Sequence, residues 1–560
     1  MTEHGYTPEH GYSLLDIHFS RFLAERSRLS GAEKDKFQQL VKTLTLSQEA
    51  GHSCLPVTGA EARFLETLHL VSDGGQTPLV LHNRKLYLHR YFHYETRLAE
   101  QISEMAAVTF PIGGYENLFD SYFEGSEPGT DWQKEAAKVA LQKALTIICG
   151  GPGTGKTTTV VKILALLLLA IDHTLDVALA APTGKAAMRL SESIGSSLDR
   201  MQLPAEILAA IPAEAQTLHR LLGFRRHSPQ FRHNRQNPMG WDVVVVDEAS
   251  MVDLAMMSKL VDALKPGARL LLLGDKDQLA SVESGAVLGD FIKSLPDNTV
   301  ELKKTYRFDD NIKLLAENIN TGDSEGAWTL LMDVNASNVT VLQADPIGYI
   351  GRQYAGYMAE VYRYTETTGT TGIDKIFAAF NSFQVLCTIH YGRLGVEGIN
   401  SRVESSLARR GFDCRSDSWY PGRPVLITRN DYSLDLFNGD IGICLPDSPE
   451  GPMKVWFERS DGSLKSYSPY RLPSCETVFA MTIHKSQGSE FDEVVVVLAE
   501  EENRILSREL MYTAVTRAKK SVKLVAGKQV FEQALSRNIE RFSGLADRLK
   551  EQSQQSLQAG

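Results

Sequence analysis

The segment ALTIICGGPGTGKTTTVVKILALLLL, residues 144–169, decides the fold. It is typical of a short apolar strand, a glycine-rich turn and a long apolar helix, and the turn GGPGTGKT matches the pattern GxxxxGK(S/T) in full. Only glycine-rich backbone curls closely enough to direct several N–H groups at one phosphate, and the N-terminus of the following helix adds a favourable dipole. We therefore predict a nucleotide-binding loop made by Gly150, Gly151, Pro152, Gly153, Thr154, Gly155, Lys156, Thr157 and Thr158.

Two further strand-like runs supply groups that phosphate chemistry needs. VVVVDEAS places Asp247 and Glu248 at the end of an apolar run. In such a site Lys156 reaches the β- and γ-phosphates of ATP, while the Thr157 hydroxyl and Asp247 ligate Mg²⁺. Glu248 orients or deprotonates the attacking water. RLLLLGDKDQ places Gln278 just past another strand end, where its amide can donate to the γ-phosphate and report hydrolysis.

Phosphoryl transfer also requires positive charge near oxygens that become negative, and the planar fork of arginine serves this best. Two arginines are candidates, Arg307 in LKKTYRF and Arg517 in MYTAVTRAKK. Taken alone, each is more typical of a surface arginine.

The rest of the chain indicates several domains, at about 150 residues per domain. The N-terminal region contains the apolar helix LLDIHFSRFLAERS and two short strands around Asn83 and Arg84. This helix fits either the core of a small domain or a docking surface for a partner. Two later series of apolar runs alternate with helices, which predicts an α/β protein with parallel sheets. We expect domains at 1–115, 116–335 and 336–545, with a β-rich insertion at about 405–475 and a polar tail at 546–560.

The composition restricts the partners. The 560 residues are 43% hydrophobic and 23% charged, as in ordinary globular proteins, and the formal net charge is −10. This charge argues against coating of nucleic acid or an anionic membrane by the whole surface, but a local basic channel remains compatible with it. Six scattered cysteines without a CxxC pair fit reduced thiols, and the first residues lack the pattern of a signal peptide. We expect a cytoplasmic protein with no membrane span.

In this order, the motifs resemble those of superfamily-one DNA helicases over residues 130–525. The resemblance implies two RecA-like motor domains with ATP and Mg²⁺ between them. It assigns Arg517 to the second-domain side of ATP and Arg307 to the γ-phosphate. By the same resemblance, Gln133 reads adenine, Tyr306 stacks on it and Glu490 binds ribose. The matching segments are DWQKEA, APTGKAAMRL, TLHRLLG, VVVVDEAS, LLLGDKDQLASVESG, TYRF, MTIHKSQGSEFDEV and LMYTAVTRAKK.

The wording of these motifs is most similar to the RecD family, the alpha subunits of bacterial exodeoxyribonuclease V complexes. The resemblance implies a 5′ to 3′ single-stranded DNA translocase and helicase that processes double-strand ends for recombinational repair. It also implies RecB-like and RecC-like partners in a heterotrimer, with residues 1–115 as the docking domain and an SH3-like β insertion at 405–475. The alternatives are a stand-alone repair helicase and a non-motor P-loop ATPase or structural subunit. PDNTVELKK, 296–304, has spacing too short for a nuclease metal site, so nuclease activity is assigned to a partner chain.

A basic segment indicates where DNA binds. Residues 217–240 contain five arginines, three histidines and no acid, and we expect a basic hairpin at about 223–240 with arms around Ser228 and Pro229. A solvated basic loop explains the composition equally well. The resemblance favours DNA contacts on loops at the strand ends. The expected DNA-binding residues are Thr183, Lys185, His219, Arg220, Arg225, Arg226, Thr482 and His484.

Overall fold

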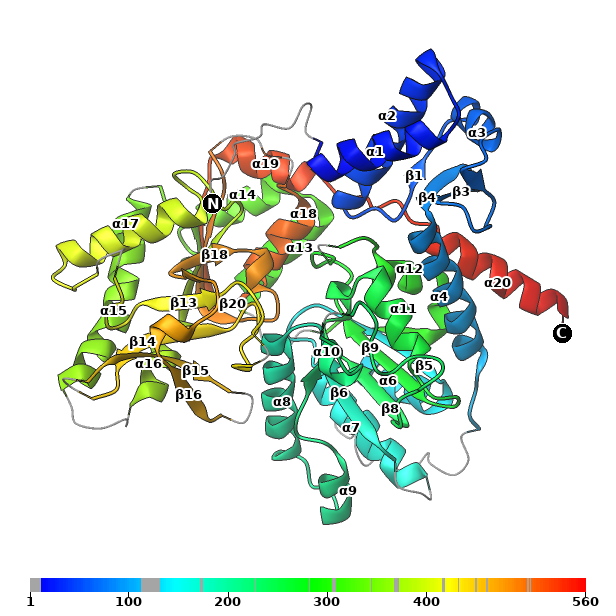
Figure 1. Ribbon diagram of the computed structural model, residues 1–560. Helices are drawn as coiled ribbons and strands as arrows, with labels where there is room; N and C mark the ends of the chain where they lie inside the picture. Colours follow the sequence, from blue (N-terminus) through cyan, green and yellow to red (C-terminus); the bar gives the residue numbers. More distant parts are fainter. Residues whose placement is uncertain are drawn as a thin grey trace.

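The computed structural model describes most of the chain (Figure 1). The described residues are 12–559 except 112–130, 172–174, 227, 282, 305–308, 344, 367–371, 415–417, 432, 449–450, 460–461, 501–502 and 504.

The first motor domain is built on a six-stranded parallel sheet in the order β10-β5-β9-β8-β6-β7. Its four central strands are buried along their whole length, as their continuous apolar sequences predict. The apolar run 163–171 lies mainly in the buried helix α7. The elements are α6 (Trp132–Gln142), β5 (Leu145–Cys149), α7 (Lys156–Ala170), β6 (Val177–Ala181), α8 (Gly184–Leu198), α9 (Ala205–Ala210), β7 (Gln216–Thr217), α10 (Leu218–Leu221), β8 (Val243–Val246), the 3-10 helix η2 (Ala249–Met251), α11 (Leu254–Asp262), β9 (Arg269–Gly274), α12 (Val287–Ser294), η3 (Pro296–Asn298) and β10 (Thr299–Glu301).

The second motor domain has a five-stranded parallel sheet in the order β11-β20-β19-β12-β18. Helices α13 and α14 pack into the core of this sheet through Ile312, Leu315 and Leu331. The packing therefore begins this unit near residue 310, earlier than the expected 336. The elements are α13 (Asp310–Thr321), α14 (Ser324–Met332), β11 (Val339–Val341), α15 (Pro346–Glu366), α16 (Ile373–Asn381), β12 (Phe383–Cys387), α17 (Val396–Arg409), β18 (Ala480–Thr482), η5 (His484–Ser486), β19 (Phe491–Val497), α18 (Arg508–Val515), β20 (Ala518–Val525) and α19 (Lys528–Ser536).

A β-rich insertion separates α17 from β18. It is an antiparallel sheet in the order β16-β15-β14-β13-β17 with its own small core around Val455 and Phe457. Its strands span 424–477. The insertion therefore begins later than the expected residue 405, which still belongs to α17. The elements are β13 (Pro424–Ile427), β14 (Ile441–Pro446), β15 (Met453–Glu458), β16 (Leu464–Tyr467), η4 (Pro469–Arg471) and β17 (Cys475–Thr477).

The N-terminal region combines helices with a four-stranded sheet. The expected pair of strands meets at Asn83 and Arg84, both with positive φ, as a tight hairpin turn requires. Only part of the apolar surface of the first helix is in the core: Leu23 is buried, whereas Leu15 is 73% exposed and Phe22 48% exposed. The elements are α1 (Leu14–Arg26), α2 (Gly31–Glu49), β1 (Leu55–Pro56), α3 (Gly59–Glu66), β2 (Val71–Ser72), β3 (Leu79–His82), β4 (Lys85–Leu88) and α4 (His89–Ala107).

The C-terminal end differs from the expected polar tail. Residues Leu545–Ala559 form helix α20, which lies beside α4 and α12 (Figure 1). Leu545 and Leu549 are buried in the core of the first motor domain, together with Leu98 and Ile102 of α4. Two apolar residues one turn apart therefore give this otherwise polar helix a docking face.

The six cysteines are free, and five of them are buried, as the sequence predicts for reduced thiols. Among the helices that the structure describes, none combines the length and apolar character needed to cross a membrane.

Candidate active site and nucleic-acid interface

The glycine-rich turn joins β5 to α7 and has the backbone shape that a phosphate loop needs. Gly153 and Gly155 have φ of +77° and +81°, a region that favours glycine. A Cβ on Gly150 would lie 2.7 Å from Thr154 Oγ1, so this position has no room for a side chain. Lys156 Nζ donates hydrogen bonds to the carbonyls of Gly150 (2.6 Å) and Gly151 (3.0 Å). The lysine is thus held over the mouth of the loop.

The two acids follow β8 at the same sheet edge. Burial and the neighbouring Glu248 raise the pKa of Asp247, and the charge of Lys156 opposes this rise. Glu248 has φ of +51°, which a side-chain-bearing residue rarely adopts, and its N–H donates to Asp247 Oδ1 at 2.9 Å. Such local strain is common at functional sites and directs Glu248 away from the ordinary strand path.

A hydrogen-bond network crosses from the first motor domain to the second. Arg517 is 2% exposed, and its Nη2 donates to Gln278 Oε1 at 2.7 Å. The Gln278 amide donates to Asp275 Oδ2 at 3.1 Å, and the Tyr512 hydroxyl donates to the same oxygen at 3.1 Å. Burial raises the pKa of Asp275. A Cβ on Gly151 would lie 2.9 Å from Tyr512 Oη, so the second domain also contacts the phosphate loop directly.

A cavity of about 440 Å³ connects these groups. Lys156, Thr157, Asp247 and Glu248 line it from the first domain, and Arg517 lines it from the second. The remaining predicted residues on its wall are Pro152, Gly153, Gly155, Thr158, Gln278 and Glu490.

The donor set of this cavity fits ATP with Mg²⁺. The loop backbone and Lys156 complement phosphate oxygens, and the Thr157 hydroxyl and the Asp247 carboxylate provide the oxygen ligands that Mg²⁺ prefers. A cation beside Asp247 would offset the burial that raises its pKa. The residues present are thus suited to both groups.

The predicted adenine and sugar contacts have different outcomes. Glu490 lies on the cavity wall, where it pairs with Arg189 of α8 and, at 3.8 Å, with Lys519. Gln133 is in the first turn of α6 and is absent from the described residues that line the cavity. Tyr306 and Arg307 lie outside the described residues.

Sequence reasoning missed three residues of this site. Arg189 and Lys519 hold Glu490 by charge, and Tyr512 connects Asp275 to the phosphate loop. All three stand inside motifs quoted from the sequence, APTGKAAMRL and LMYTAVTRAKK. Their positions inside these motifs were a signal in the sequence. Only the fold shows that the two distant segments meet at this site.

A second cavity, of about 330 Å³, separates the first motor domain from the β insertion. We call it the basic cleft. Lys185, Thr217 and Arg220 of the first domain line it. Of these, Lys185 and Arg220 are expected DNA-binding residues. From the insertion it is lined by Phe437, by the basic Arg459 and Lys465, and by the acidic Asp435, Asp440 and Glu458; Phe377 and Asn381 of α16 line it as well.

Lys185 is the most unusual group of the basic cleft. Its Nζ is buried and has no hydrogen-bond partner among the described residues. Burial lowers the pKa of Lys185 to about 8, while Asp440 acts in the opposite direction. The ammonium lies 5.6 Å from the centre of the Phe491 ring. A buried cation without a hydrogen-bond partner is costly, and an anionic ligand would relieve that cost.

The other predicted DNA contacts lie apart from the cleft wall. Thr183 caps α8 by accepting from Ala186 N at 3.2 Å, and Thr482 ends β18. His219 packs edge-on against Phe231, with ring centres 5.6 Å apart, and burial lowers its pKa. Burial also lowers the pKa of His484, and Arg541 adds to the effect.

The expected hairpin, residues 223–240, is a loop and not a pair of strand-like arms. Among the described residues of 223–240 there is no strand, and only an isolated bridge joins Asn234 and Asn237. Backbone bonds from Arg232 N to Gly223 O (2.8 Å) and from His233 N to Leu222 O (3.0 Å) close its base. Pro229 and Pro238 have no N–H to donate to a ladder. The side chains of Ser228 and Asn234 accept from the backbone N–H groups two residues on, which makes local turns in place of strands.

The loop faces the β insertion. Arg225 and Arg226 are exposed on it. Hydrogen bonding from Ser433 and, more weakly, the charge of Arg226 hold the pKa of Asp431 in the insertion below its usual value. Arg226 of the loop therefore lies close enough to the insertion for its charge to act on Asp431.

Two RecA-like domains that share one phosphate site are typical of DNA helicases. Residues 133–284 match the family model described as an AAA domain, and residues 477–525 match the UvrD-like helicase C-terminal domain. The RecBCD enzyme subunit RecD of Mycolicibacterium smegmatis is 41% identical, over 85% of this chain and 84% of that protein. The subunit of the same name from Haemophilus influenzae is 35% identical, over 85% and 81%. This chain belongs to the RecD family of RecBCD enzyme subunits.

The match extends to a second kind of relative. The ATP-dependent RecD2 DNA helicase of Deinococcus radiodurans is 32% identical over 83% of this chain, but over only 59% of its own length. The chain thus spans most of the RecD subunits and a little over half of the RecD2 protein.

Proposed function

We propose that this chain is an ATP-dependent DNA helicase that moves 5′ to 3′ along single-stranded DNA. It works as the RecD subunit beside RecB-like and RecC-like subunits, on single strands and on the ends of duplex DNA. One observation carries the proposal: Arg517 of the second domain enters the cavity of Lys156 and hydrogen-bonds Gln278 of the first. Because both domains complete the site, hydrolysis there changes how they hold each other.

The chemistry is phosphoryl transfer to water. Lys156 and the loop N–H groups hold the phosphates, and Glu248 orients the water or accepts its proton. Arg517 stabilises the negative charge that develops on the transferred phosphoryl group. Mg²⁺, held through Thr157 and Asp247, would neutralise phosphate charge.

We assign the basic cleft to the DNA backbone. Its buried ammonium at Lys185 and its arginines suit phosphates, and Phe437 offers a ring for base stacking. The cleft lies between the first motor domain and the insertion, so a strand bound there contacts parts that change separation when the nucleotide cavity opens and closes. This arrangement converts hydrolysis into movement along the strand.

The proposal is tested by ATPase and strand-displacement assays. We expect the full chain to hydrolyse ATP faster when single-stranded DNA is added, and to unwind duplexes with a 5′ tail in preference to those with a 3′ tail. Lys156→Gln should abolish both activities. ATPase activity indifferent to DNA would indicate a P-loop phosphotransferase or small-molecule ATPase instead, and preference for 3′ tails would contradict the polarity.

A structural role for the subunit is tested separately in the assembled complex. If the motor matters, the complex with Lys156→Gln should lose DNA processing that the wild-type complex performs. Equal activity of the two complexes, together with loss of activity when the whole chain is deleted, would show that only the presence of the chain is needed.

A further inference from the structure

The segment 537–551, which we call the C-terminal strap, connects all three parts of the molecule. It leaves α19 in the second motor domain, where its Arg537 carbonyl accepts from Arg508 N at 2.9 Å and Ile539 N donates to the Glu509 carboxylate at 3.1 Å. It then crosses to the N-terminal region and enters α20 beside α4 (Figure 1). A segment with such a path can transmit displacement between the parts.

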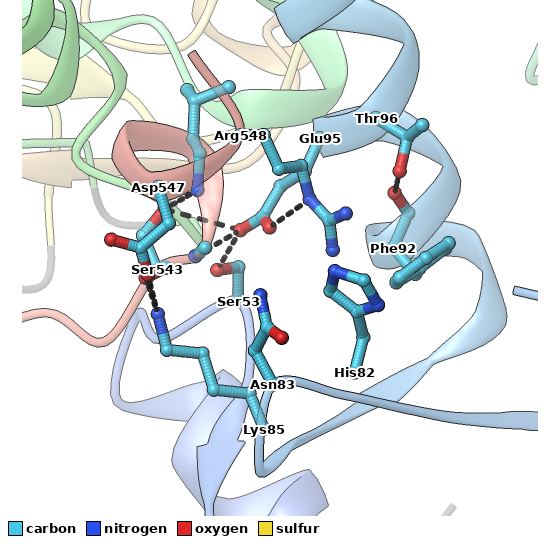
Figure 2. Close-up of polar contacts among 12 residues, drawn as sticks. Ser53, His82, Asn83, Lys85, Phe92, Glu95, Thr96, Ser543, Asp547 and Arg548 are labelled. Atoms are coloured by element: carbon cyan, nitrogen blue, oxygen red, sulfur yellow. Dashed lines mark hydrogen bonds and ion pairs between the residues drawn. The ribbon is translucent and has the colours of Figure 1, made fainter. Parts of the chain in front are cut away.

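The far end of the strap is anchored at a buried carboxylate. Glu95 of α4 is fully buried and accepts from Ser53 Oγ (2.5 Å), Gly544 N (3.1 Å) and Arg548 Nε (3.4 Å) (Figure 2). Nearby, Lys85 Nζ bonds Asp547 Oδ2 at 2.5 Å and the Ser543 carbonyl at 2.9 Å. The strap is therefore fixed to the N-terminal region by charge-assisted bonds, which are among the stronger hydrogen bonds.

The middle of the strap holds the loop that follows Gln278. Arg541 Nη1 donates to the carbonyls of Glu283 (2.9 Å) and Gly285 (3.0 Å), and Nη2 donates to that of Ser281. One rigid guanidinium thus fixes three carbonyls of one loop.

The N-terminal region supports the same contact. The Gly285 N–H donates to the Gly51 carbonyl at 2.9 Å, and Ser284 Oγ donates to the Gln48 carbonyl at 3.3 Å. Gly51 has φ of +87°, and a Cβ there would lie 2.7 Å from Arg541 Cζ. Position 51 therefore requires glycine both for its backbone conformation and for the approach of the guanidinium.

The other end of the loop reaches the nucleotide cavity. Leu279 N donates to Thr513 Oγ1 at 2.9 Å, and the Leu279 carbonyl accepts from Gln487 Nε2 at 2.9 Å. Its neighbour Gln278 holds Arg517. The loop is thus clamped by the second motor domain at one end and by Arg541 with the N-terminal region at the other.

We propose that Arg541 is a positioning residue for ATP hydrolysis, which sets Gln278 against Arg517 through the loop and makes that setting depend on the N-terminal region. The inference rests on the proposed function, because it needs hydrolysis in this cavity. Without Arg541 the carbonyls of Ser281, Glu283 and Gly285 lose their common anchor. Gln278 then departs from the placement that Arg517 requires, while the phosphate loop that binds ATP remains intact.

The test compares variants of the full chain in DNA-stimulated ATPase assays and in direct binding of a fluorescent ATP analogue. Arg541→Ala should lower kcat about tenfold, as expected for a small misplacement of a catalytic group. The dissociation constant of this variant for the ATP analogue should stay within about twofold of the wild-type value, because the phosphate loop that binds ATP is intact. Arg541→Lys, which keeps the charge but loses the fork, should restore only part of kcat. Hydrogen exchange should rise at Gly285 and Leu279 and remain unchanged in β5.

Arg548→Met is the matched comparator, since it removes a buried arginine of the same strap that anchors to Glu95 and does not touch the loop. It should lower Tm yet keep kcat closer to wild type than Arg541→Ala does. Unchanged kcat in Arg541→Ala, parallel loss of kcat and ATP binding, or the same pattern in both variants would overturn the inference. If the Lys156→Gln variant keeps the ATPase activity of the wild type, the proposed function is overturned instead.

Discussion

The nucleotide cavity and the basic cleft lie on the same molecule but are built in opposite ways. The cavity takes its phosphate loop from one short stretch of backbone after β5, and Asp247 and Glu248 directly follow β8 of the same sheet. The cleft instead combines side chains of α8 and α10 with an insertion more than two hundred residues later. The comparison teaches that local backbone geometry leaves a readable pattern, whereas a surface assembled from distant segments does not.

The largest expected effect tests whether the cavity works independently of the cleft. Glu248→Gln removes the group that orients or deprotonates water but leaves Lys156 and the loop, so kcat for ATP should fall by about 10²- to 10⁴-fold. ATP binding and single-stranded DNA binding should persist, as measured by fluorescence titration. Weak ATP binding in this variant would contradict the assigned role, and Glu301→Gln, an acid outside the cavity wall, serves as the control.

The next effect tests the second-domain half of the cavity. Tyr512→Phe keeps the ring but removes the hydroxyl that binds Asp275, and we expect kcat to fall about tenfold with little change in ATP affinity, because catalytic geometry is sensitive to small shifts. Steady-state kinetics across ATP concentration separate the two constants. A change in the Michaelis constant alone would mean that Tyr512 contributes to binding and not to placement.

How much the sequence could predict follows from the same comparison. The central strands were predictable because buried parallel strands are continuous apolar runs, and Lys156, Asp247 and Glu248 were predictable because their motifs end such strands. The docking of α20 was not, since Leu545 and Leu549 are two apolar residues in a polar stretch and their partners lie in α4. The expected arms of the basic segment failed because side-chain turns at Ser228 and Asn234 replace the ladder.

A smaller effect is expected in the cleft. Lys185→Ala removes the buried ammonium, so affinity for single-stranded DNA should fall about tenfold and the slope of log affinity against log salt should flatten by about 0.7. Basal ATPase without DNA should stay unchanged. Fluorescence anisotropy at several salt concentrations measures both quantities. Lys313→Ala is the matched control, at a lysine of α13 whose side chain is 43% exposed, and equal losses in the two variants would mean that Lys185 makes no specific contact with the strand.

The smallest effect concerns a partly buried acid outside both sites. Burial raises the pKa of Asp290 in α12 to about 6, so the native state holds its proton more tightly than the unfolded chain does. The free energy of unfolding therefore declines as pH rises from about 4 to about 6, and Asp290→Asn should remove that decline. Urea titrations should find the variant more stable than wild type by about 3 kcal/mol at about pH 8, with the difference vanishing near pH 4. Asp297→Asn, at an exposed position, is the control. A stability difference independent of pH would mean that the variant acts through packing around α20 and not through the charge of Asp290. In either case, ATPase activity and DNA binding should stay unchanged.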